Sequence, residues 1–420
     1  MDVLVIGGGG REHAICWALR KSPRLGKLYC APGNGGIADI AECVDISAVD
    51  IDSVVRFART ANIGLVMVAP DDPLALGMVD ALEAAGIRAF GPRKNAATIE
   101  SSKAFSKDLM RRYNIPTARY EVFDNASDAK AYIQKQGAPI VVKADGLALG
   151  KGVTVAMDLQ SALDAVDELM LSKKFGESGN SVVIEEYMTG PEVTVLAFTD
   201  GVTVVPMLSS QDHKRAFTGD LGPNTGGMGA FCPSQNYTPE IEKICMDTIL
   251  RPTIDAMRDE GRLFKGVIYF QLMLTSEGPR VIEYNARFGD PETQAVLPML
   301  KTDLLDVFDA VIEGKLHEIH IEWQGGASCC VVIASGGYPG EYGKGYPISG
   351  LDDMPSGVIV FHAGTARGGD GYVTSGGRVL GVTAMGGDLD KAASLAYDGV
   401  ERISFQNSYY REDIGGRKRA

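Results

Sequence analysis

Hydrophobic and polar residues alternate in blocks along the first 100 residues, and these blocks predict strands and helices in turn. Short apolar runs predict buried strands over residues 3–6, 27–31, 65–69 and 88–91. Apolar positions at helical spacing predict helices over residues 11–20, 54–61 and 79–85. Strands that alternate with helices are typical of βαβ units. We therefore expect an N-terminal α/β domain with a parallel sheet over residues 1–102.

The middle of the chain mixes hairpins with longer helices. The predicted strands lie at 140–144, 152–157, 181–186, 266–275 and 279–285. The predicted helices lie at 103–114, 161–171, 239–260, 292–299 and 303–313. Residues 192–208 alternate like an antiparallel hairpin turned at Asp200-Gly201. Residues 209–233 show little periodicity, which indicates an irregular stretch with a functional or mobile role. We expect an α+β middle domain over residues 103–314.

The last part of the chain follows a break near residues 314–326. It begins with a predicted strand at 328–334, continues through glycine-rich turns and contains a predicted helix at 389–402. We expect a small C-terminal α/β domain over residues 327–420. The whole chain is then a multidomain protein of the α/β and α+β classes.

Composition narrows the function classes. The 420 residues contain 41 Lys and Arg against 54 Asp and Glu, a net charge of −13, which argues against broad binding to nucleic acid. The sequence has no apolar run of the roughly 18 residues that a membrane span needs, and it enters a strand without a basic leader. Its 7 cysteines lack CxxC spacing, so we expect reduced thiols in a cytoplasmic protein. The pair His317 and His320 is a weak metal signal.

A glycine-rich loop, Gly7 to Gly10, joins the first predicted strand to the first predicted helix. Free N–H groups and the helix dipole favour an anion at such a junction. A dinucleotide-binding loop needs a further glycine where this chain has Glu12, which weakens that interpretation. Tight packing of strand against helix remains an alternative.

The segment VVKADGLALGKGV, residues 141–153, places Lys143 at the end of a strand and Lys151 in a glycine-rich loop. Backbone N–H groups and a lysine in such a loop can fold over a triphosphate. The segment is not a Walker A motif, because a strand follows it. The alternative is a loose hairpin with surface lysines.

Acidic residues follow the next strand. Residues 184–188, which include Glu185, can hydrogen-bond an adenine edge, and Glu192 a few residues later can hold ribose hydroxyls. A solvated acidic turn is the alternative interpretation. The charges of Gln211-Asp212-His213-Lys214-Arg215 suit a zwitterionic substrate, unless they form a solvated loop.

The segment VIEYNARFGDPE, residues 281–292, carries polar side chains at alternate positions. Glu283, Asn285 and Arg287 share one face of the predicted strand. A carboxylate and an amide oxygen suit a Mg²⁺ ion that is shared with phosphates. An arginine beside them can neutralise a phosphoryl group in transfer.

Together these stretches resemble an ATP-grasp domain, and the whole chain resembles the glycinamide ribonucleotide synthetase family of purine synthesis. The resemblance rests on GGGGREHA, PGNGG, SKAFSKDLM, VKADGLALGKGV, QDHKRAFTGDLGPNTGGMGAF, GVIYFQLM, EYNARFGDPE and YYREDIGGR. It runs from residue 7 to residue 417. The QDHKR, GPNTGGMG and RFGDPE blocks are the most specific.

The resemblance implies roles for the matching residues. ATP phosphates would contact Lys103, Lys143, Gly150 and Lys151. Adenine would meet Glu185, Glu186 and Tyr187, and the ribose would meet Glu192. Mg²⁺ or Mn²⁺ would bind Glu283 and Asn285. Glycine and the reacting phosphoryl group would lie among Asp212, Lys214, Arg215 and Arg287. Phosphoribosylamine would lie near Gly9, Gly10, Asn34, Asp71 and Lys344. Within the middle domain, residues 120–190 would form a mobile part that covers the nucleotide.

The chain departs from the family pattern at two positions. Asp71 stands where a glutamate is usual, so its side chain is one methylene shorter. Gln271 stands where the family tends to have glycine, next to the metal-binding strand. The first departure weakens a contact to the substrate ribose, which Asp72 could replace. The second brings a larger side chain toward the nucleotide.

The resemblance implies an ATP-dependent ligase that works in two steps, through glycyl phosphate. The GDLGPNTGGMG stretch would close over the acyl phosphate and exclude water. The small-molecule partners would be glycine and 5-phosphoribosylamine, with no nucleic acid, no membrane and a monomeric state. Three alternatives are a related ligase that uses formate or bicarbonate, a dinucleotide-dependent oxidoreductase and a non-catalytic nucleotide-binding regulator.

Overall fold

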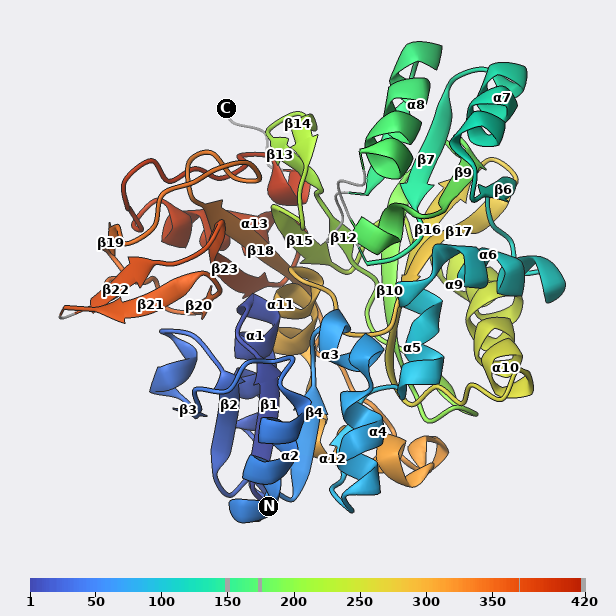
Figure 1. Ribbon diagram of the computed structural model, residues 1–420. Helices are drawn as coiled ribbons and strands as arrows, with labels where there is room; N and C mark the ends of the chain where they lie inside the picture. The colour runs from blue at the N-terminus through green and yellow to red at the C-terminus, as the bar shows by residue number, and fades with distance from the viewer. Residues whose placement is uncertain (148–151, 173–175, 370, 417–420) are drawn as a thin grey trace.

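The structure, a computed structural model, describes residues 1–147, 152–172, 176–369 and 371–416. Four larger sheets organise these residues. An N-terminal sheet lies at the bottom of Figure 1, a C-terminal sheet at the left and a small helix-covered sheet at the upper right, with a central sheet between them. None of the helices in the described ranges is both long and apolar enough to cross a lipid bilayer.

The N-terminal sheet is parallel, with the strand order β3-β2-β1-β4-β5. Its strands are β1 (Val3–Gly7), β2 (Leu28–Pro32), β3 (Glu42–Cys43), β4 (Leu65–Val68) and β5 (Ala89–Phe90). The helices between and after them are α1 (Gly10–Leu19), α2 (Ile51–Thr60), α3 (Asp71–Leu76), α4 (Met78–Ala84) and α5 (Lys94–Ser101). The predicted parallel sheet is confirmed. The loop after β1 lies at the carboxyl ends of the strands, where open parallel sheets bind ligands.

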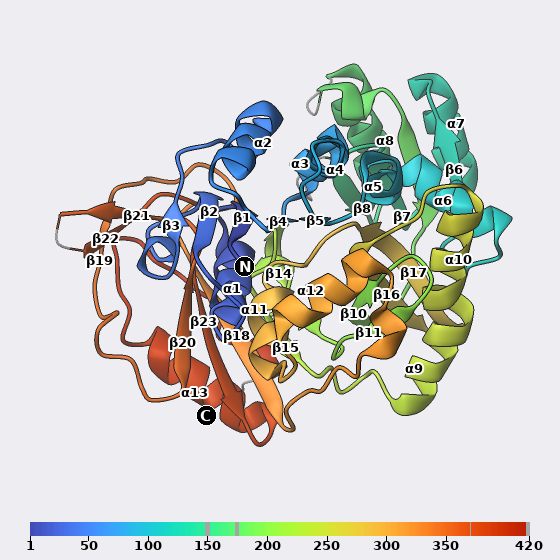
Figure 2. The same ribbon diagram turned by 90° about the horizontal axis from the view of Figure 1, so that it is seen from below.

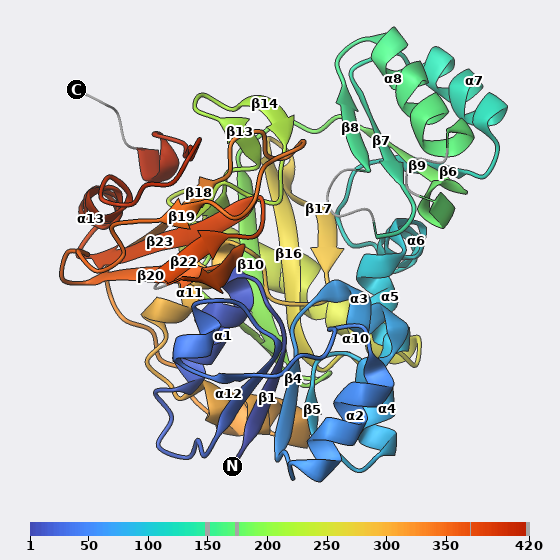
Figure 3. The ribbon, with the colours of Figure 1, turned by 60° about the vertical axis from the view of Figure 1, so that its left-hand side comes forward.

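A second sheet, with the order β6-β9-β7-β8, stands apart at the upper right of Figure 3. Its strands are β6 (Tyr120–Phe123), β7 (Ile140–Ala144), β8 (Val153–Ala156) and β9 (Val182–Glu186). The helices α7 (Ala126–Gln136) and α8 (Leu159–Val166) bury small and branched residues against it, which form a separate core. Helix α6 (Lys103–Arg112) leads into this sheet.

The central sheet is antiparallel, with the order β11-β10-β16-β17. Its strands are β10 (Glu192–Thr199), β11 (Val204–Pro206), β16 (Gly266–Thr275) and β17 (Gly278–Asn285), and the helices α9 (Pro239–Cys245) and α10 (Arg251–Asp259) pack beside it. The predicted 192–208 hairpin is confirmed. A β-bulge interrupts β17, because Gln271 pairs with Glu283 while Leu272 pairs with Val281. The extra residue is Ile282, whose carbonyl is left outside the regular ladder.

Residues 209–233 are more regular than the sequence predicted. They contain β12 (Gln211–Asp212), β13 (Arg215–Phe217), β14 (Leu221–Asn224) and β15 (Gly229–Cys232). The prediction of an irregular stretch is therefore wrong. Strands of two to four residues are too short to show alternation, and glycines at positive φ, such as Gly219 and Gly227, lie between them.

Strands β12 and β15 join the C-terminal sheet, which has the order β12-β15-β18-β23-β20. Its other strands are β18 (Ala327–Ala334), β20 (Val358–His362) and β23 (Arg378–Gly386). A smaller sheet contains β19 (Pro347–Ile348), β21 (Thr365–Gly368) and β22 (Gly371–Thr374), and helix α13 (Leu389–Val400) packs on β18 and β23. Cys329 and Cys330 are fully buried in β18, as core residues.

Helix α11 (Glu292–Val296) contacts α1, β15 and β18, and α12 (Leu304–Glu313) contacts β5 and β16. Figure 2 shows α11 in this position, between the N-terminal helix and the C-terminal sheet. The short helix α11 therefore lies where three parts of the molecule meet.

Candidate active site

Three buried charges lie at the junction of the helix-covered sheet and the central sheet. The carboxylate atom Oε2 of Glu185 is 3.0 Å from Nζ of Lys107 and 3.1 Å from Nζ of Lys143. The three side chains are at most 4% exposed. Lys143 also donates to the carbonyl of Ile282, the bulge residue of β17, over 3.2 Å. The two sheets are thus joined by a charged hydrogen-bond network.

Burial and neighbouring charge oppose each other in this cluster. Burial lowers the pKa of Lys107 to about 8, although Glu185 favours its charged form. Burial acts on Lys143 in the same sense, but Glu185 and Glu283 outweigh it and raise the pKa of this ammonium group. The two lysines likewise overcome burial and lower the pKa of Glu185. Oε1 of Glu185 is buried and has no hydrogen-bond partner among the described residues, so it can accept from a ligand.

Lys107 was missed by the sequence analysis. It follows Lys103 by four residues in α6, and residues at that spacing lie on one face of a helix. This four-residue spacing is the sequence feature from which Lys107 could have been predicted.

The face of β17 that carries Glu283 and Asn285 adjoins this cluster. Oδ1 of Asn285 accepts from Nη2 of Arg287 over 3.0 Å, so the structure brings the predicted residues together. Burial raises the pKa of Glu283, but the positive charges of Lys143 and Lys103 outweigh it and lower this pKa overall. An ionised carboxylate beside an amide oxygen is a donor set that suits Mg²⁺.

This donor set is small. No group of three or more His, Cys, Asp or Glu residues that could hold a metal occurs in the part of the chain that the structure describes. Two protein oxygens fit a metal ion that takes its remaining ligands from phosphates and water, as Mg²⁺ commonly does.

Arg287 is held by a glutamate that the sequence analysis missed. Glu100, near the end of α5, places Oε1 3.2 Å from Nη2 of Arg287, and its Oε2 accepts from the N–H of Ala286 over 2.6 Å. Burial raises the pKa of Glu100 to about 7, although the charge of Arg287 lowers it in part. Nε of Arg287 is buried without a partner among the described residues. Nothing in the local sequence marks Glu100.

Asp212 and Lys214 form a second charged pair, with 3.1 Å between Oδ2 and Nζ. Oδ1 of Asp212 is buried and has no partner among the described residues. Nearby, the hydroxyl of Tyr269 donates to Oε1 of Glu292 over 2.9 Å. Burial raises the pKa of Asp212 and of Glu292, although Lys214 acts against it at both groups. Glu292, within the RFGDPE block, is a further residue for which no role was predicted.

Carboxylates already contact the glycine-rich loop. The N–H of Gly9 donates to Oε2 of Glu12 over 2.6 Å, and the N–H of Arg11 donates to Oδ2 of Asp290 over 3.4 Å. Asn34 braces this loop, because its Nδ2 donates to the carbonyls of Gly8 and His362 over 2.9 and 2.8 Å. A substrate phosphate at Gly9 and Gly10 would therefore meet acidic neighbours.

The remaining nucleotide candidates have other contacts. Nζ of Lys103 donates to the carbonyl of Gly146 over 2.9 Å. The carboxylate of Glu186 pairs with Arg119 and Arg280, over 2.6 and 2.9 Å. Tyr187 is 37% exposed. Gly150 and Lys151 lie outside the described residues.

Gln271, the residue that departs from the family pattern, is buried beside Glu192. Its Nε2 donates to Oε2 of Glu192 over 2.7 Å. The larger side chain therefore orients the carboxylate that was predicted to meet the ribose.

The other substrate candidates are more dispersed. Arg215 donates to the carbonyl of Gly222 over 2.7 Å within its own hairpin. Asp71 lies at the start of α3, and its negative charge helps to raise the pKa of Glu100. Lys344 is exposed, with Nζ 6.0 Å from the ring centre of Tyr342.

Comparisons with known proteins define the class first. Residues 101–293 match the family model described as the phosphoribosylglycinamide synthetase ATP-grasp (A) domain, so the middle of the chain is an ATP-grasp domain. Residues 1–100 and 328–417 match the models for the N and C domains of the same synthetase. The chain belongs to the phosphoribosylglycinamide synthetase family.

Relatives with established names agree over the full length. The chain is 49% identical to the phosphoribosylamine–glycine ligase of Halalkalibacterium halodurans over 99% of this chain and 97% of that protein. It is 50% identical to the Rhizobium meliloti ligase of the same name, over 99% and 98%. The family and the enzyme class predicted from the sequence are confirmed, and the oxidoreductase alternative is wrong.

Solved structures support the fold. The crystal structure of phosphoribosylamine–glycine ligase from Thermotoga maritima has a TM-score of 0.87 and 30% identity, and the match covers 98% of this chain and all of that one. The biotin carboxylase domain of Hydrogenobacter thermophilus 2-oxoglutarate carboxylase, in complex with MgADP and bicarbonate, has a TM-score of 0.75, with 97% of this chain and 91% of that one covered. Its identity is 16%, so it shows the fold alone. The predicted fold class is confirmed.

Proposed function

We propose that the chain ligates glycine to 5-phosphoribosylamine at the expense of ATP, giving glycinamide ribonucleotide, ADP and phosphate in purine biosynthesis. The full-length identity of 46–50% to several relatives named phosphoribosylamine–glycine ligase supports these substrates. One structural observation supports this chemistry. Glu283 and Asn285 place an ionised carboxylate and an amide oxygen on one face of β17, and three lysines close to Glu283 lower its pKa. That arrangement suits phosphoryl transfer.

The nucleotide would lie between the helix-covered sheet and the central sheet. We assign its phosphates to Lys103, Lys143, Gly150 and Lys151, its adenine to Glu185, Glu186 and Tyr187, and its ribose to Glu192. The free Oε1 of Glu185 supports this assignment, because the exocyclic amine of adenine is a donor. The side chain of Glu186 is engaged by two arginines, and its N–H donates to the carbonyl of Arg119 over 2.9 Å, so adenine would have to displace one of these contacts to be bound by either group.

The metal would be Mg²⁺ or Mn²⁺ at Glu283 and Asn285. When bound there, it would neutralise charge on the phosphates. Arg287 sits beside these two residues with an unpartnered Nε, so it can place a second positive group against the transferring phosphoryl. Turnover titrated with each metal in turn would decide between them.

The reaction would proceed in two displacements. A carboxylate oxygen of glycine attacks the γ-phosphorus of ATP, the bond to ADP breaks, and glycyl phosphate forms. The amine of phosphoribosylamine then attacks the carbonyl carbon, phosphate leaves with the bonding electrons, and the nitrogen loses a proton. No protein nucleophile is needed, so Asp212, Lys214, Arg215 and Arg287 act by orientation and charge. The buried, unpartnered Oδ1 of Asp212 is suited to the ammonium group of glycine.

Phosphoribosylamine would lie near Gly9, Gly10, Asn34, Asp71 and Lys344. The position of the glycine loop at the carboxyl ends of a parallel sheet supports this assignment. Lys344 is exposed and its role rests on the family resemblance alone.

We also propose three domains, 1–102, 103–314 and 327–420, with residues 120–190 as a mobile nucleotide-covering part. The separate core of that part supports its independence. Strands β12 and β15 cross from the middle domain into the C-terminal sheet. A monomeric, cytoplasmic protein without nucleic-acid partners stays a prediction, which light scattering and nucleic-acid binding assays can check.

The test of the proposed function is ADP release from Mg-ATP, with glycine and freshly generated phosphoribosylamine omitted in turn. We expect release that requires both substrates and yields one amide per ADP. Release driven by formate or bicarbonate would instead favour the related-ligase alternative, and no release under any combination would favour the non-catalytic regulator.

A further inference from the structure

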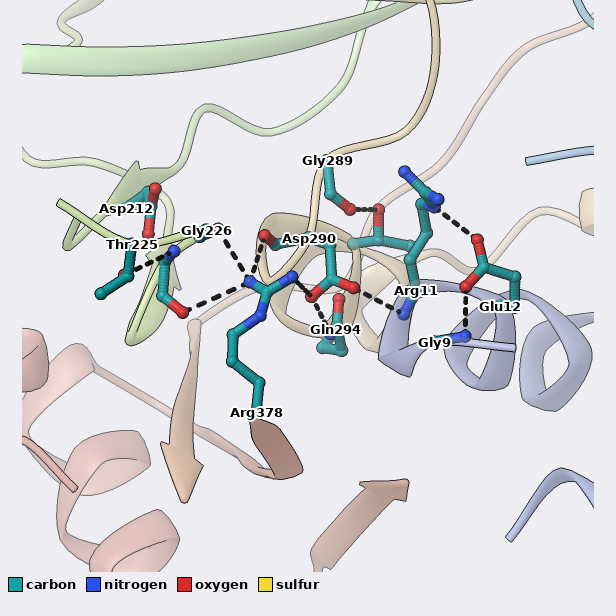
Figure 4. Close-up of polar contacts among 12 residues, drawn as sticks. Gly9, Arg11, Glu12, Asp212, Thr225, Gly226, Gly289, Asp290, Gln294 and Arg378 are labelled. Carbon is teal, nitrogen blue, oxygen red and sulfur yellow. Dashed lines mark hydrogen bonds and ion pairs between the residues drawn. The ribbon is translucent and has the colours of Figure 1, made fainter. Parts of the chain in front are cut away.

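One arginine of the C-terminal sheet holds a turn of the middle domain. Nη1 of Arg378, at the start of β23, donates to the carbonyls of Gly226 and Asp290, over 2.7 and 2.8 Å, with a longer contact of 3.3 Å to Gly227. Figure 4 shows the guanidinium group between Gly226 and Asp290. Tyr338, also from the C-terminal part, adds a contact of 3.1 Å between its hydroxyl and the N–H of Gly226.

The carboxylate of Asp290 is the second half of this junction. Its Oδ1 lies 3.4 Å from Nη2 of Arg378 and accepts from Nε2 of Gln294 over 2.8 Å. Its Oδ2 accepts from the N–H of Arg11, at the beginning of α1 (Figure 4). Burial raises the pKa of Asp290, but Arg378 and Arg11 outweigh it, so the carboxylate is ionised. Asp290 therefore joins the glycine loop of the N-terminal domain to the C-terminal sheet.

The turn that Arg378 holds packs directly on Asp212. A Cβ built at Gly227 would lie 2.7 Å from Oδ1 of Asp212 and 2.5 Å from Cδ of Pro291, so no side chain fits there. Thr225 bonds the carbonyl of Lys214 through both its N–H and its hydroxyl, each over 2.8 Å. A shift of this turn would therefore move Asp212 and Lys214 with it.

We propose that Arg378 is a positioning residue for the second displacement: it fixes the Asp212 turn, where glycyl phosphate would form, against the Asp290 junction, where the glycine loop would present the amine. The inference rests on the proposed function. Correct relative placement of two reactants supplies much of the rate of a bimolecular step. When the two halves are misaligned, water attacks the carbonyl carbon of the acyl phosphate instead, and glycine and phosphate are released without amide.

The experiment compares Arg378→Lys and Arg378→Met with the unaltered chain, with all substrates present. ADP, amide and free phosphate are measured in one reaction, and hydroxylamine traps escaping acyl phosphate as a hydroxamate. Because the turn, Asp212 and Lys214 would shift as one unit relative to the glycine loop, we expect ADP formation to fall only about threefold, while amide per ADP falls about tenfold and hydroxamate rises. Lysine retains the charge but loses the fork that contacts the carbonyls through Nη1 and the carboxylate of Asp290 through Nη2, so Arg378→Lys should retain the coupling only in part.

Two further variants keep the test decisive. Asp290→Asn preserves shape and removes the charge at the other half of the junction, so it should lower the coupling in the same direction. Arg402→Met removes a partly exposed arginine that pairs with Asp353 elsewhere in the C-terminal part, and should leave all readouts unchanged. Unchanged coupling in the Arg378 variants, or an equal loss of ADP and amide, would overturn the inference. A chain without glycine-dependent ADP formation even when unaltered would instead overturn the proposed function.

Discussion

The two ends of the candidate active site are built in different ways. At the nucleotide end, Glu185 lies between two lysines, and the group comes from one helix and two neighbouring strands within 80 residues of sequence. At the acceptor end, Asp290 is contacted by Arg11 and Arg378. Arg11 belongs to α1, near the start of the chain, and Arg378 belongs to β23 of the C-terminal sheet. The nucleotide end is therefore a local construction, whereas the acceptor end exists only when the terminal domains dock on the middle one.

Substitution of Glu283, which belongs to the nucleotide end alone, should cause the largest loss of turnover. We expect Glu283→Gln to lower turnover by about 10²–10³, the usual loss when a charge-stabilising group is removed. The melting temperature should fall only slightly: the variant keeps the shape, but it removes a carboxylate whose pKa the neighbouring lysines lower overall, so its ionised form contributes to stability. The measurements are ADP release and thermal unfolding.

Glu277→Gln is the matched control, because Glu277 is 73% exposed in the turn before the same strand. It should retain near-normal turnover. Turnover within a few-fold of normal in Glu283→Gln would remove Glu283 from the metal site.

Lys107 tests whether the nucleotide end depends on the complete Lys–Glu–Lys group. We expect Lys107→Met to raise KM for ATP about tenfold, since Glu185 then keeps a single cation and its orientation is less fixed. In the unaltered chain burial lowers the pKa of Lys107 to about 8 from its usual 10.5. ATP binding should therefore weaken as the pH rises through about 8, and the variant should lack this alkaline limb.

The lowered pKa of Lys107 affects stability in the opposite direction to ATP binding as the pH rises. Between about pH 8 and 10.5 the unfolded chain holds more protons at this lysine, so its contribution to the free energy of unfolding rises with pH. Lys130→Met is the control, since Lys130 pairs with Asp167 on the outer helices. An unchanged KM and an identical alkaline limb in Lys107→Met would show that Lys143 alone holds Glu185.

The same contrast explains how much the sequence could reveal. Lys143, Glu185 and Glu283 were found because each stands in a strand whose pattern marks it as out of place. Glu100 and Arg378 were missed because they act through tertiary contacts, chiefly to Arg287 and to Asp290, that no local spacing encodes. The parallel sheet and the main hairpins were predicted from periodicity. The strands of residues 209–233 were not, because each is shorter than a repeating pattern requires.

Gln271 orients the carboxylate of Glu192 at the nucleotide end. We expect Gln271→Leu to raise KM for ATP about threefold, because Glu192 loses the donor that orients it, while kcat changes little. A hydrogen bond to a charged group contributes about 1.5–3 kcal/mol at most, and water can replace part of it here. The measurement is KM for ATP and for 2′-deoxy-ATP.

If Glu192 contacts the ribose, the KM values for ATP and 2′-deoxy-ATP should differ less in Gln271→Leu than in the unaltered chain. Equal KM changes for both would place Glu192 away from that hydroxyl. Gln160→Leu, on the outer helix α8, is the control and should change neither value.

The smallest expected effect concerns docking at the acceptor end, where His13 of α1 meets His362 of β20. Nδ1 of His13 accepts from the N–H of His362 over 2.8 Å, which requires an unprotonated nitrogen. Burial lowers the pKa of His13 to about 3, with the neighbouring charge of His362 acting in the same sense, and burial lowers the pKa of His362 to about 4. Because both pKa values lie below the unfolded value, the unfolded chain binds more protons below about pH 6.5.

The free energy of unfolding should therefore fall as the pH drops from about 6.5 toward 4, by at most about 1.4 kcal/mol per pH unit for each histidine. His13→Gln keeps an acceptor but cannot titrate, so its unfolding free energy should depend less steeply on pH than that of the unaltered chain. Chemical denaturation between pH 8 and 5 measures both slopes, and His320→Gln, at an exposed histidine, should retain the full slope. If His13→Gln retained the full slope too, protonation of His13 would not account for the pH dependence, and the contact between His13 and His362 would not make docking of the N-terminal helix sensitive to pH.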